Sequence, residues 1–122
     1  MPVLKVYGMP SSFAQETLGD LIDSLQIASG SVLGLSTGEI SVFFPADLVQ
    51  RGLGEELVCF VDGLFEKPER TRSLRRTLAS AIVSKLSMFV LEYLPQCGKV
   101  EAIINRFNQD ADGFAVWERR SG

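Results

Sequence analysis

The stretch MPVLKVYGM, residues 1–9, decides the expected fold and the expected chemistry. β-Branched, apolar and aromatic residues fill positions 3–7 and Gly8 follows them, which predicts a strand over 3–7. Removal of Met1 would turn the nitrogen of Pro2 into a secondary amine, whereas retention of Met1 leaves it in an amide without basicity. An α-amino group has a pKa of about 7.7–8.0 in water, and burial or a nearby cation lowers it toward neutrality. Pro2 is therefore a candidate general base in a chain that has no histidine.

The remainder of the first half predicts one helix and one strand. Ser12 and Gln15 are spaced as a capping box, and apolar residues keep a helical period to about Ile27. Residues 29–31 and 34–38 are expected to be loops. The apolar run over 40–44 predicts the second strand, and residues 46–56 are expected to be a linker.

The second half repeats this order of elements. A strand is predicted over 57–61, stopped at Asp62-Gly63. Thr71 is a plausible N-cap of a long helix that Pro95 terminates. A further strand is predicted over 100–104, and residues 114–117 are expected to add a short edge strand.

The two halves also resemble each other in sequence. PVLKVYGM, residues 2–9, aligns with LVCFVDGL, residues 57–64, and the two share both valines and the glycine. We therefore expect one domain over 1–122 that arose by duplication, with halves of about 1–45 and 57–107. A right-handed crossover in each half would place both helices on one face of a four-stranded sheet. The opposite face would be bare and apolar, which predicts an oligomer.

The composition of the chain indicates which kinds of partner and which cellular compartment to expect. Apolar residues make up 46% of the chain, the mean hydropathy is +0.17, the net charge is −3 and the pI is about 4.9. This acidic balance argues against nucleic acid as a partner. No apolar run is long enough to span a membrane and no signal peptide is visible, so a cytoplasmic location is expected.

The sequence contains no convincing pattern of metal-ligating or cofactor-binding residues. Cys59 and Cys97 make neither a disulfide framework nor a metal site. The segment 108–113, NQDADG, matches the first half of a calcium loop, but Arg119 stands where the bidentate glutamate belongs. An ordinary acidic turn is the favoured interpretation. No metal and no cofactor are expected.

With Pro2 at the tip of the first strand and two strand-helix-strand units, the chain resembles the tautomerase superfamily, which includes 4-oxalocrotonate tautomerase and macrophage migration inhibitory factor. The resemblance covers nearly the whole chain in element order. It implies an α+β tautomerase-like fold and a homotrimer with the sheets facing inward. It also implies a tautomerase or isomerase that uses Pro2 on small α-keto or enol carboxylic acids, provided that Met1 is removed.

The resemblance also implies binding residues. In 4-oxalocrotonate tautomerase and related dehalogenases an arginine followed by serine opens the equivalent helix and binds the substrate carboxylate, and Arg70-Thr71 stands there in this chain. A guanidinium can grip a carboxylate with two hydrogen bonds. Gly113-Phe114 matches a glycine-aromatic pair after the fourth strand, so Phe114 would wall the pocket. Arg106 is a further candidate carboxylate ligand, with an ordinary surface arginine as the alternative.

The family pattern breaks at other positions. Glu101 and Ile103 replace a tyrosine and an asparagine that macrophage migration inhibitory factor supplies from its fourth strand, and residues 33–37 lack the family's lysine. Two alternatives to a tautomerase therefore stay open. The first is an inactive trimer that binds ligands or partners. The second is a dehalogenase, hydratase or decarboxylase in which Pro2 is a general acid and Glu101 polarises a water.

Overall fold

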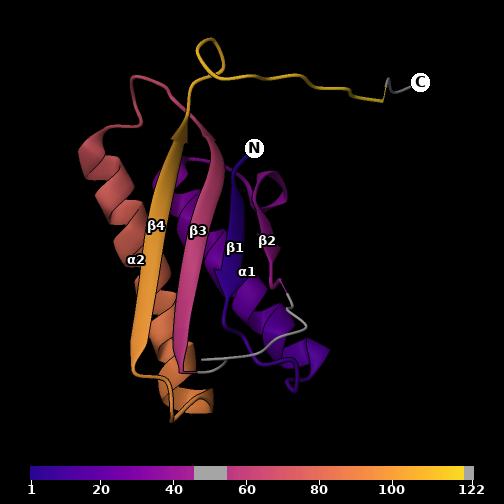
Figure 1. The fold of residues 1–122 in the computed structure, drawn as a ribbon, viewed down its shortest axis with the longest axis vertical. Coiled ribbons are helices and arrows are strands. Elements are labelled where there is room, and N and C mark those ends of the chain that lie inside the picture. Colours follow the sequence, from indigo (N-terminus) through magenta and orange to yellow (C-terminus); the bar gives the residue numbers. More distant parts are fainter. Residues whose placement is uncertain (46–54, 120–122) are drawn as a thin grey trace.

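The computed structural model describes residues 1–45 and 55–119. Its elements are β1 (Val3–Tyr7), α1 (Gln15–Leu33), the 3-10 helix η1 (Thr37–Glu39), β2 (Ser41–Phe43), β3 (Glu56–Phe65), α2 (Arg72–Tyr93) and β4 (Lys99–Phe107). Both helices lie behind one face of a four-stranded sheet (Figure 1). The expected α+β class is confirmed. Most of the linker expected over 46–56 lies outside the described residues.

The sheet consists of two parallel pairs joined in the middle. The strand order is β2-β1-β3-β4, with β1 parallel to β2 and β3 parallel to β4. The central pair, β1 and β3, is antiparallel and aligns Val3 with Asp62 and Tyr7 with Val58. Each half is therefore one β-α-β unit, as the sequence predicted, and the two units face each other across the central pair.

Two glycines at equivalent places in the units bear on the expected duplication. Gly8 and Gly63 align in the sequence comparison, and both have positive φ, at 93° and 72°. A Cβ on Gly8 would collide with the carbonyl oxygen of Glu56, and a Cβ on Gly63 would lie 2.7 Å from the carbonyl oxygen of Met1. Each glycine thus lets its strand approach the start of the other strand. The same close approach therefore occurs at the aligned position in both halves.

The core lies between the sheet and the helices. Leu4 and Val6 of β1 and the alternate residues of β3 point into it, and the stripe of α2 covers them with Leu78, Ile82, Leu86, Phe89 and Val90. Thr71 caps α2 as predicted, since its Oγ1 accepts a hydrogen bond from the Leu74 amide at 3.2 Å. Neither helix combines the length and apolarity that a membrane span requires, in the residues that the structure describes.

The predicted limits of α1 were wrong at both ends. The helix begins at Gln15 with Ala14 as N-cap, so Ser12 and Gln15 form no capping box. It also continues through the expected loop at 29–31 to Leu33. Ser29 and Gly30 are buried, and a Cβ on Gly30 would lie 2.6 Å from the Leu35 carbonyl oxygen. The small residues that suggested a loop instead allow close packing inside a helix. A capping box does exist, between Ser36 and Glu39 of η1.

The strands of the second half are longer than predicted. β3 does not stop at Asp62-Gly63, because Gly63 forms an irregularity and the strand resumes at Leu64. This glycine therefore marks a bulge and not a turn. β4 extends from Lys99 to Phe107, and its extra residues pair with the end of β3. The edge strand expected over 114–117 is absent from the described chain, where residues 113–119 extend away from the body (Figure 1).

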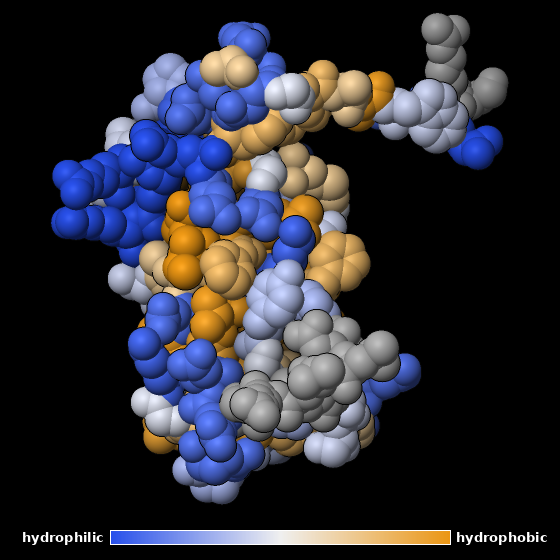
Figure 2. Space-filling view, in the orientation of Figure 1, coloured by the Kyte–Doolittle hydropathy of each residue, from blue (hydrophilic) through white to orange (hydrophobic). Residues whose placement is uncertain are grey.

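The face of the sheet opposite the helices is bare but only partly apolar. Tyr7 and Phe60 pack edge to face with ring centroids 5.6 Å apart, and Ile103, the partner of Phe60 in β4, is exposed beside them. Hydrophobic and hydrophilic residues both appear on this face (Figure 2). Lys5 and Asp62 form an ion pair at 3.2 Å on the same face. The Asn105 amide also donates to Asp62 at 2.7 Å and, with Lys5, holds the pKa of Asp62 below its usual value, although burial opposes the shift. The prediction of an entirely apolar face therefore needs correction.

The two thiols should differ in reactivity. Burial, with a smaller contribution from the charge of Asp62, raises the pKa of Cys59 to about 12, whereas Cys97 lies near the surface. At pH 8 we expect a thiol reagent to modify Cys97 quickly and Cys59 only after denaturation, because the thiolate is the nucleophile. Mass mapping of the labelled peptides measures this. Rapid native labelling of Cys59 would contradict the buried position of β3.

Candidate active site

A cavity of about 320 Å³ opens where β1 begins. Four segments that are distant in sequence contribute to it: the chain start, the link between α1 and β2, the end of β3 and the turn before α2. The residues that line it are Met1, Pro2, Leu35, Glu39, Phe65, Lys67 and Arg70. The structure therefore brings Pro2 and Arg70 to one cavity.

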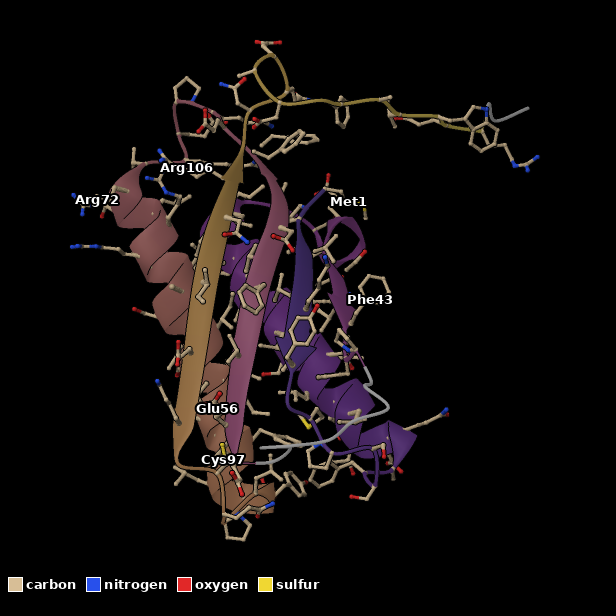
Figure 3. The ribbon with its side chains drawn as sticks, in the orientation of Figure 1. Met1, Phe43, Glu56, Arg72, Cys97 and Arg106 are labelled. Carbon is tan, nitrogen blue, oxygen red and sulfur yellow. The ribbon has the colours of Figure 1, made fainter. Side chains whose placement is uncertain are left out.

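Pro2 is held at the floor of this cavity by the sheet. It is buried, and its carbonyl accepts a hydrogen bond from the Ser41 amide at 3.2 Å, so the parallel pairing of β1 and β2 fixes its position. Met1 is 57% exposed and lies at the same end of the sheet as Arg106, opposite Glu56 and Cys97 (Figure 3). Proline also has a fixed φ. Its ring nitrogen thus has a defined place beside the cavity.

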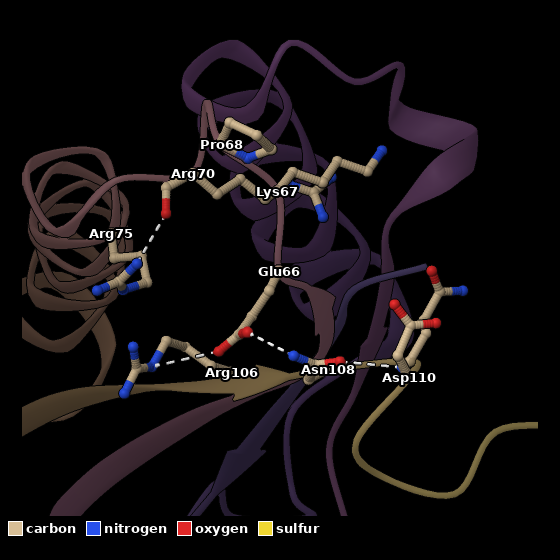
Figure 4. A pocket seen from close by; sticks show the side chains of 9 residues that line it. Glu66, Lys67, Pro68, Arg70, Arg75, Arg106, Asn108 and Asp110 are labelled. Carbon is tan, nitrogen blue, oxygen red and sulfur yellow. Dashed lines mark hydrogen bonds and ion pairs between the residues drawn. The ribbon is translucent and has the colours of Figure 1, made fainter.

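Arg70 lies in a tight turn between β3 and α2. Its amide donates to the Lys67 carbonyl at 3.0 Å, and its Nη1 donates to the Phe65 carbonyl at 2.7 Å. Arg75 in turn donates from Nη1 to the Arg70 carbonyl at 2.7 Å (Figure 4). The hydrogen bond to Phe65 uses one of the five N–H donors of the Arg70 guanidinium and orients the side chain. This arrangement can present the remaining donors to an anion.

The electrostatics of the cavity affect any amine at the chain start. The pKa of the Met1 amine is lowered, chiefly by burial and then by the charges of Arg70 and Lys67. Glu39 is the acidic residue of the lining, and its Oε2 accepts hydrogen bonds from the Ser36 amide at 2.8 Å and hydroxyl at 3.2 Å. The site therefore combines two cations with a carboxylate already engaged in a capping box.

Arg106 lines a neighbouring cavity and not the one at Pro2. This second cavity, of about 430 Å³, shares Lys67 and Arg70 with the first. The Nε of Arg106 lies 3.9 Å from Oε1 of Glu66, and both side chains are largely exposed (Figure 4). Within one chain, Arg106 therefore lines the neighbouring cavity and does not contact the cavity at Pro2.

The acidic turn after β4 is stabilised by hydrogen bonds between its side chains and its main-chain amides. Asn108 Oδ1 accepts hydrogen bonds from the amides of Asp110 at 2.9 Å and Ala111 at 3.0 Å. Asp112 Oδ2 accepts one from the Asn108 amide at 2.9 Å. These oxygens are engaged with the main chain, which agrees with the interpretation of the segment as an ordinary turn.

Phe114 does not line the Pro2 cavity itself but packs against Phe65, which does. Its ring packs edge to face on Phe65, with centroids 5.1 Å apart, and lies 6.1 Å from Phe107. Phe65 lines the cavity, so Phe114 supports the wall from behind.

Glu101 is not brought to this cavity by its own chain. It aligns with Val58, and Val58 aligns with Tyr7 at the far end of β1. That place is five residues from Pro2, or roughly 16 Å at the rise of a strand. Glu101 instead forms an ion pair with Lys99 at 2.7 Å.

Sequence reasoning missed several residues of the lining. Lys67, Leu35, Glu39 and Phe65 were not among the candidate residues that the sequence offered. The first three come from connections whose paths a sequence pattern does not predict. Phe65 was missed because the strand was expected to end before it.

Comparison with known proteins supports the fold through structure alone. No protein-family model matches the chain, and no curated protein matches it. Solved structures do match: wild-type F6 fused 4-OT, an asymmetric trimer, has a TM-score of 0.68 at 16% identity, covering 92% of this chain and 91% of its own. Pt0534 inactivated by 2-oxo-3-pentynoate has a TM-score of 0.67 at 16% identity, covering 93% and 91%. N1, a member of the cis-3-chloroacrylic acid dehalogenase family, has a TM-score of 0.63 at 19% identity, covering 92% and 79%.

These matches define the class of fold. The chain has the fold of these proteins, and the expected tautomerase-like fold is confirmed. The similar structures include both a fused 4-OT and a dehalogenase-family protein.

Proposed function

We propose that this protein is a tautomerase or isomerase that uses the free amine of Pro2 on small α-keto or enol carboxylic acids. The observation that carries the proposal is the shared cavity: Pro2 and the oriented guanidinium of Arg70 line the same 320 Å³ space. A base and a carboxylate ligand in one cavity are what proton transfer next to a carboxylate requires.

The environment favours a neutral amine at working pH. Burial, Arg70 and Lys67 already lower the pKa of the Met1 amine, although Met1 is mostly exposed. Pro2 is buried one residue further in, so the same causes would act on its nitrogen after Met1 is removed. Neutral Pro2 would take the proton from the enol hydroxyl. The resulting ammonium would then deliver a proton to the carbon, which yields the ketone and restores the amine.

Dehalogenation, hydration and decarboxylation are three alternative reactions that we propose for the same cavity. Inactivation of Pt0534 by 2-oxo-3-pentynoate motivates that compound as a probe of an amine at Pro2, and N1 motivates haloacrylates as substrates. Dehalogenation or hydration would require a group that activates water, and Glu101 of the same chain is placed too far away for that role. A binding protein without activity remains the alternative if Met1 is retained. The test is ketonisation of phenylenolpyruvate by protein that begins at Pro2, with Met1-retaining protein as the control.

We further propose a homotrimer, because the bare sheet face needs a cover and the F6 and Q0 fused 4-OT proteins are described as trimers. Light scattering should give a mass of about 40 kDa, three times 13.4 kDa. The apolar part of the face, around Tyr7 and Phe60, would lose water on assembly. Phe60→Glu should therefore shift the protein toward monomer, whereas a wild-type monomer at micromolar concentration would contradict the assembly.

A further inference from the structure

Gly63 lies against the atoms that would leave with Met1. A Cβ at this position would lie 2.7 Å from the Met1 carbonyl oxygen and 3.7 Å from the Met1 carbonyl carbon. That carbon is bonded to the nitrogen of Pro2, at about 1.33 Å in any peptide. The missing side chain of Gly63 is therefore adjacent to the side on which the Pro2 nitrogen becomes open once Met1 is gone.

We propose that Gly63 keeps clear the space in which a ligand atom meets the Pro2 amine, and so determines which compounds reach it. This inference rests on the proposed function of Pro2. The other two bonds of the nitrogen belong to the proline ring, so the lone pair and the N–H of the free amine would lie on either side of the direction in which the Met1 carbonyl carbon lay. An atom that exchanges a proton with the amine must come within about 2.6–3.2 Å on that side of the nitrogen. A methyl group on residue 63 would occupy the edge of that space.

Gly63 is also required by its backbone conformation, and the experiment must separate this effect from the effect on space near the Pro2 amine. Its φ of 72° is costly for any residue with a side chain, whatever the space around it. Gly34 has nearly the same φ, 69°, and a Cβ there would meet nothing within 4 Å. Gly34→Ala is therefore a control for the backbone cost alone.

Gly8 supplies the complementary control. It is the counterpart of Gly63 in the first half, it has a φ of 93°, and a Cβ on it would collide with the carbonyl oxygen of Glu56. Glu56 lies inside the chain, so its carbonyl is never removed. Gly8→Ala thus reproduces the same kind of crowding at a place where processing of Met1 changes nothing.

The first experiment is thermal unfolding of each alanine variant in two forms, with Met1 removed and with Met1 retained by inhibiting methionine aminopeptidase in the host. Gly34→Ala should lower Tm equally whether Met1 is present or absent, and the same should hold for Gly8→Ala. Gly63→Ala should lower Tm by about 3–6 °C more when Met1 is present, the shift that a modest destabilisation produces in a domain of this size. An equal loss in both forms would overturn the proposal, because the glycine would then serve the bulge alone.

The second experiment measures access to the amine in protein that begins at Pro2. The probes are phenylenolpyruvate ketonisation and covalent addition of 2-oxo-3-pentynoate. In that addition the Pro2 nitrogen bonds to the alkyne carbon distal to the ketone, one carbon–carbon π bond breaks, and the ammonium proton moves to the adjacent carbon. Nothing leaves, so the intact mass rises by the whole reagent. Gly63→Ala should reduce kcat/KM and the labelling rate by about 100-fold, as a displacement of about 1 Å can do.

The outcomes separate the two proposals. Gly34→Ala should keep the wild-type rates, and rates for Gly63→Ala that match it would overturn the role of Gly63 while leaving Pro2 chemistry intact. If wild-type protein is neither active nor labelled, the proposed function fails, and the Tm comparison still decides whether Gly63 borders the Pro2 nitrogen. Should Gly63→Ala fail to fold, Gly63→Asn tolerates positive φ and takes its place in both experiments.

Discussion

Protein that retains Met1 is expected to ketonise phenylenolpyruvate at least about 100-fold more slowly than protein that begins at Pro2, since a positioned acid or base contributes about 10²–10⁴-fold. The physical reason is the loss of a lone pair: an amide nitrogen at Pro2 neither accepts nor delivers a proton. The two forms are separated by intact mass, and their rates are followed by loss of enol absorbance.

The Met1-retaining form is a better control than Pro2→Ala. Alanine at the chain start still offers a primary amine in the same cavity, so Pro2→Ala should weaken activity without abolishing it. The Met1 amine is also placed near Arg70 and Lys67, but one residue further out. Equal rates with and without Met1 would exclude the Pro2 amine as the base.

Arg70→Ala is expected to raise KM by about 10- to 150-fold, which corresponds to the loss of a charge-assisted contact of roughly 1.5–3 kcal/mol. The oriented guanidinium of Arg70 shares the cavity with Pro2, so its removal should weaken carboxylate binding. Arg70→Lys should recover only part of the loss, because an ammonium cannot make the two-pronged contact. Steady-state kinetics on protein without Met1 measure the effect.

The same substitution should also move the pH profile. Arg70 and Lys67 both lower the pKa of the amine at the chain start. Removal of either charge would therefore raise the pKa of the Pro2 amine. The rising limb of kcat/KM should shift to higher pH in Arg70→Ala and in Lys67→Gln. Only Arg70→Ala should combine this shift with the large rise in KM.

Two arginines of the first turns of α2 provide matched controls. Arg72 and Arg76 are exposed, and neither is among the residues that line the described Pro2 cavity. Alanine at either position should change KM little. If all three alanine variants lose activity alike, the arginines act as a diffuse positive field, and the specific contact at Arg70 is wrong.

The sequence was sufficient to predict the order of elements and to single out candidate residues for a site. Alternation in β1 and β3 and the stripe from Leu78 to Val90 are local patterns, so they specified strand, helix and buried face without knowledge of the neighbours. Pro2 and Arg70 could be singled out because a proline after methionine and an arginine before a helix N-cap are themselves sequence features. The limits of α1 and β3 were mispredicted because Gly30 and Gly63 look like loop residues until their contacts are known.

Only the tertiary structure decided what surrounds the Pro2 nitrogen. Phe65 and Lys67 lie there because the two β-α-β units pack with their central strands antiparallel, which brings the end of β3 beside the start of β1. Glu39 lies there because β1 and β2 pair in parallel, which brings the link before β2 to the same end of the sheet. The packing of the two units also places Glu101 at the other end of the sheet and Gly63 against the Met1 carbonyl. These neighbours lie far apart along the chain. Their proximity depends on strand register, and a register is fixed by the burial of a whole face and not by any local run of residues.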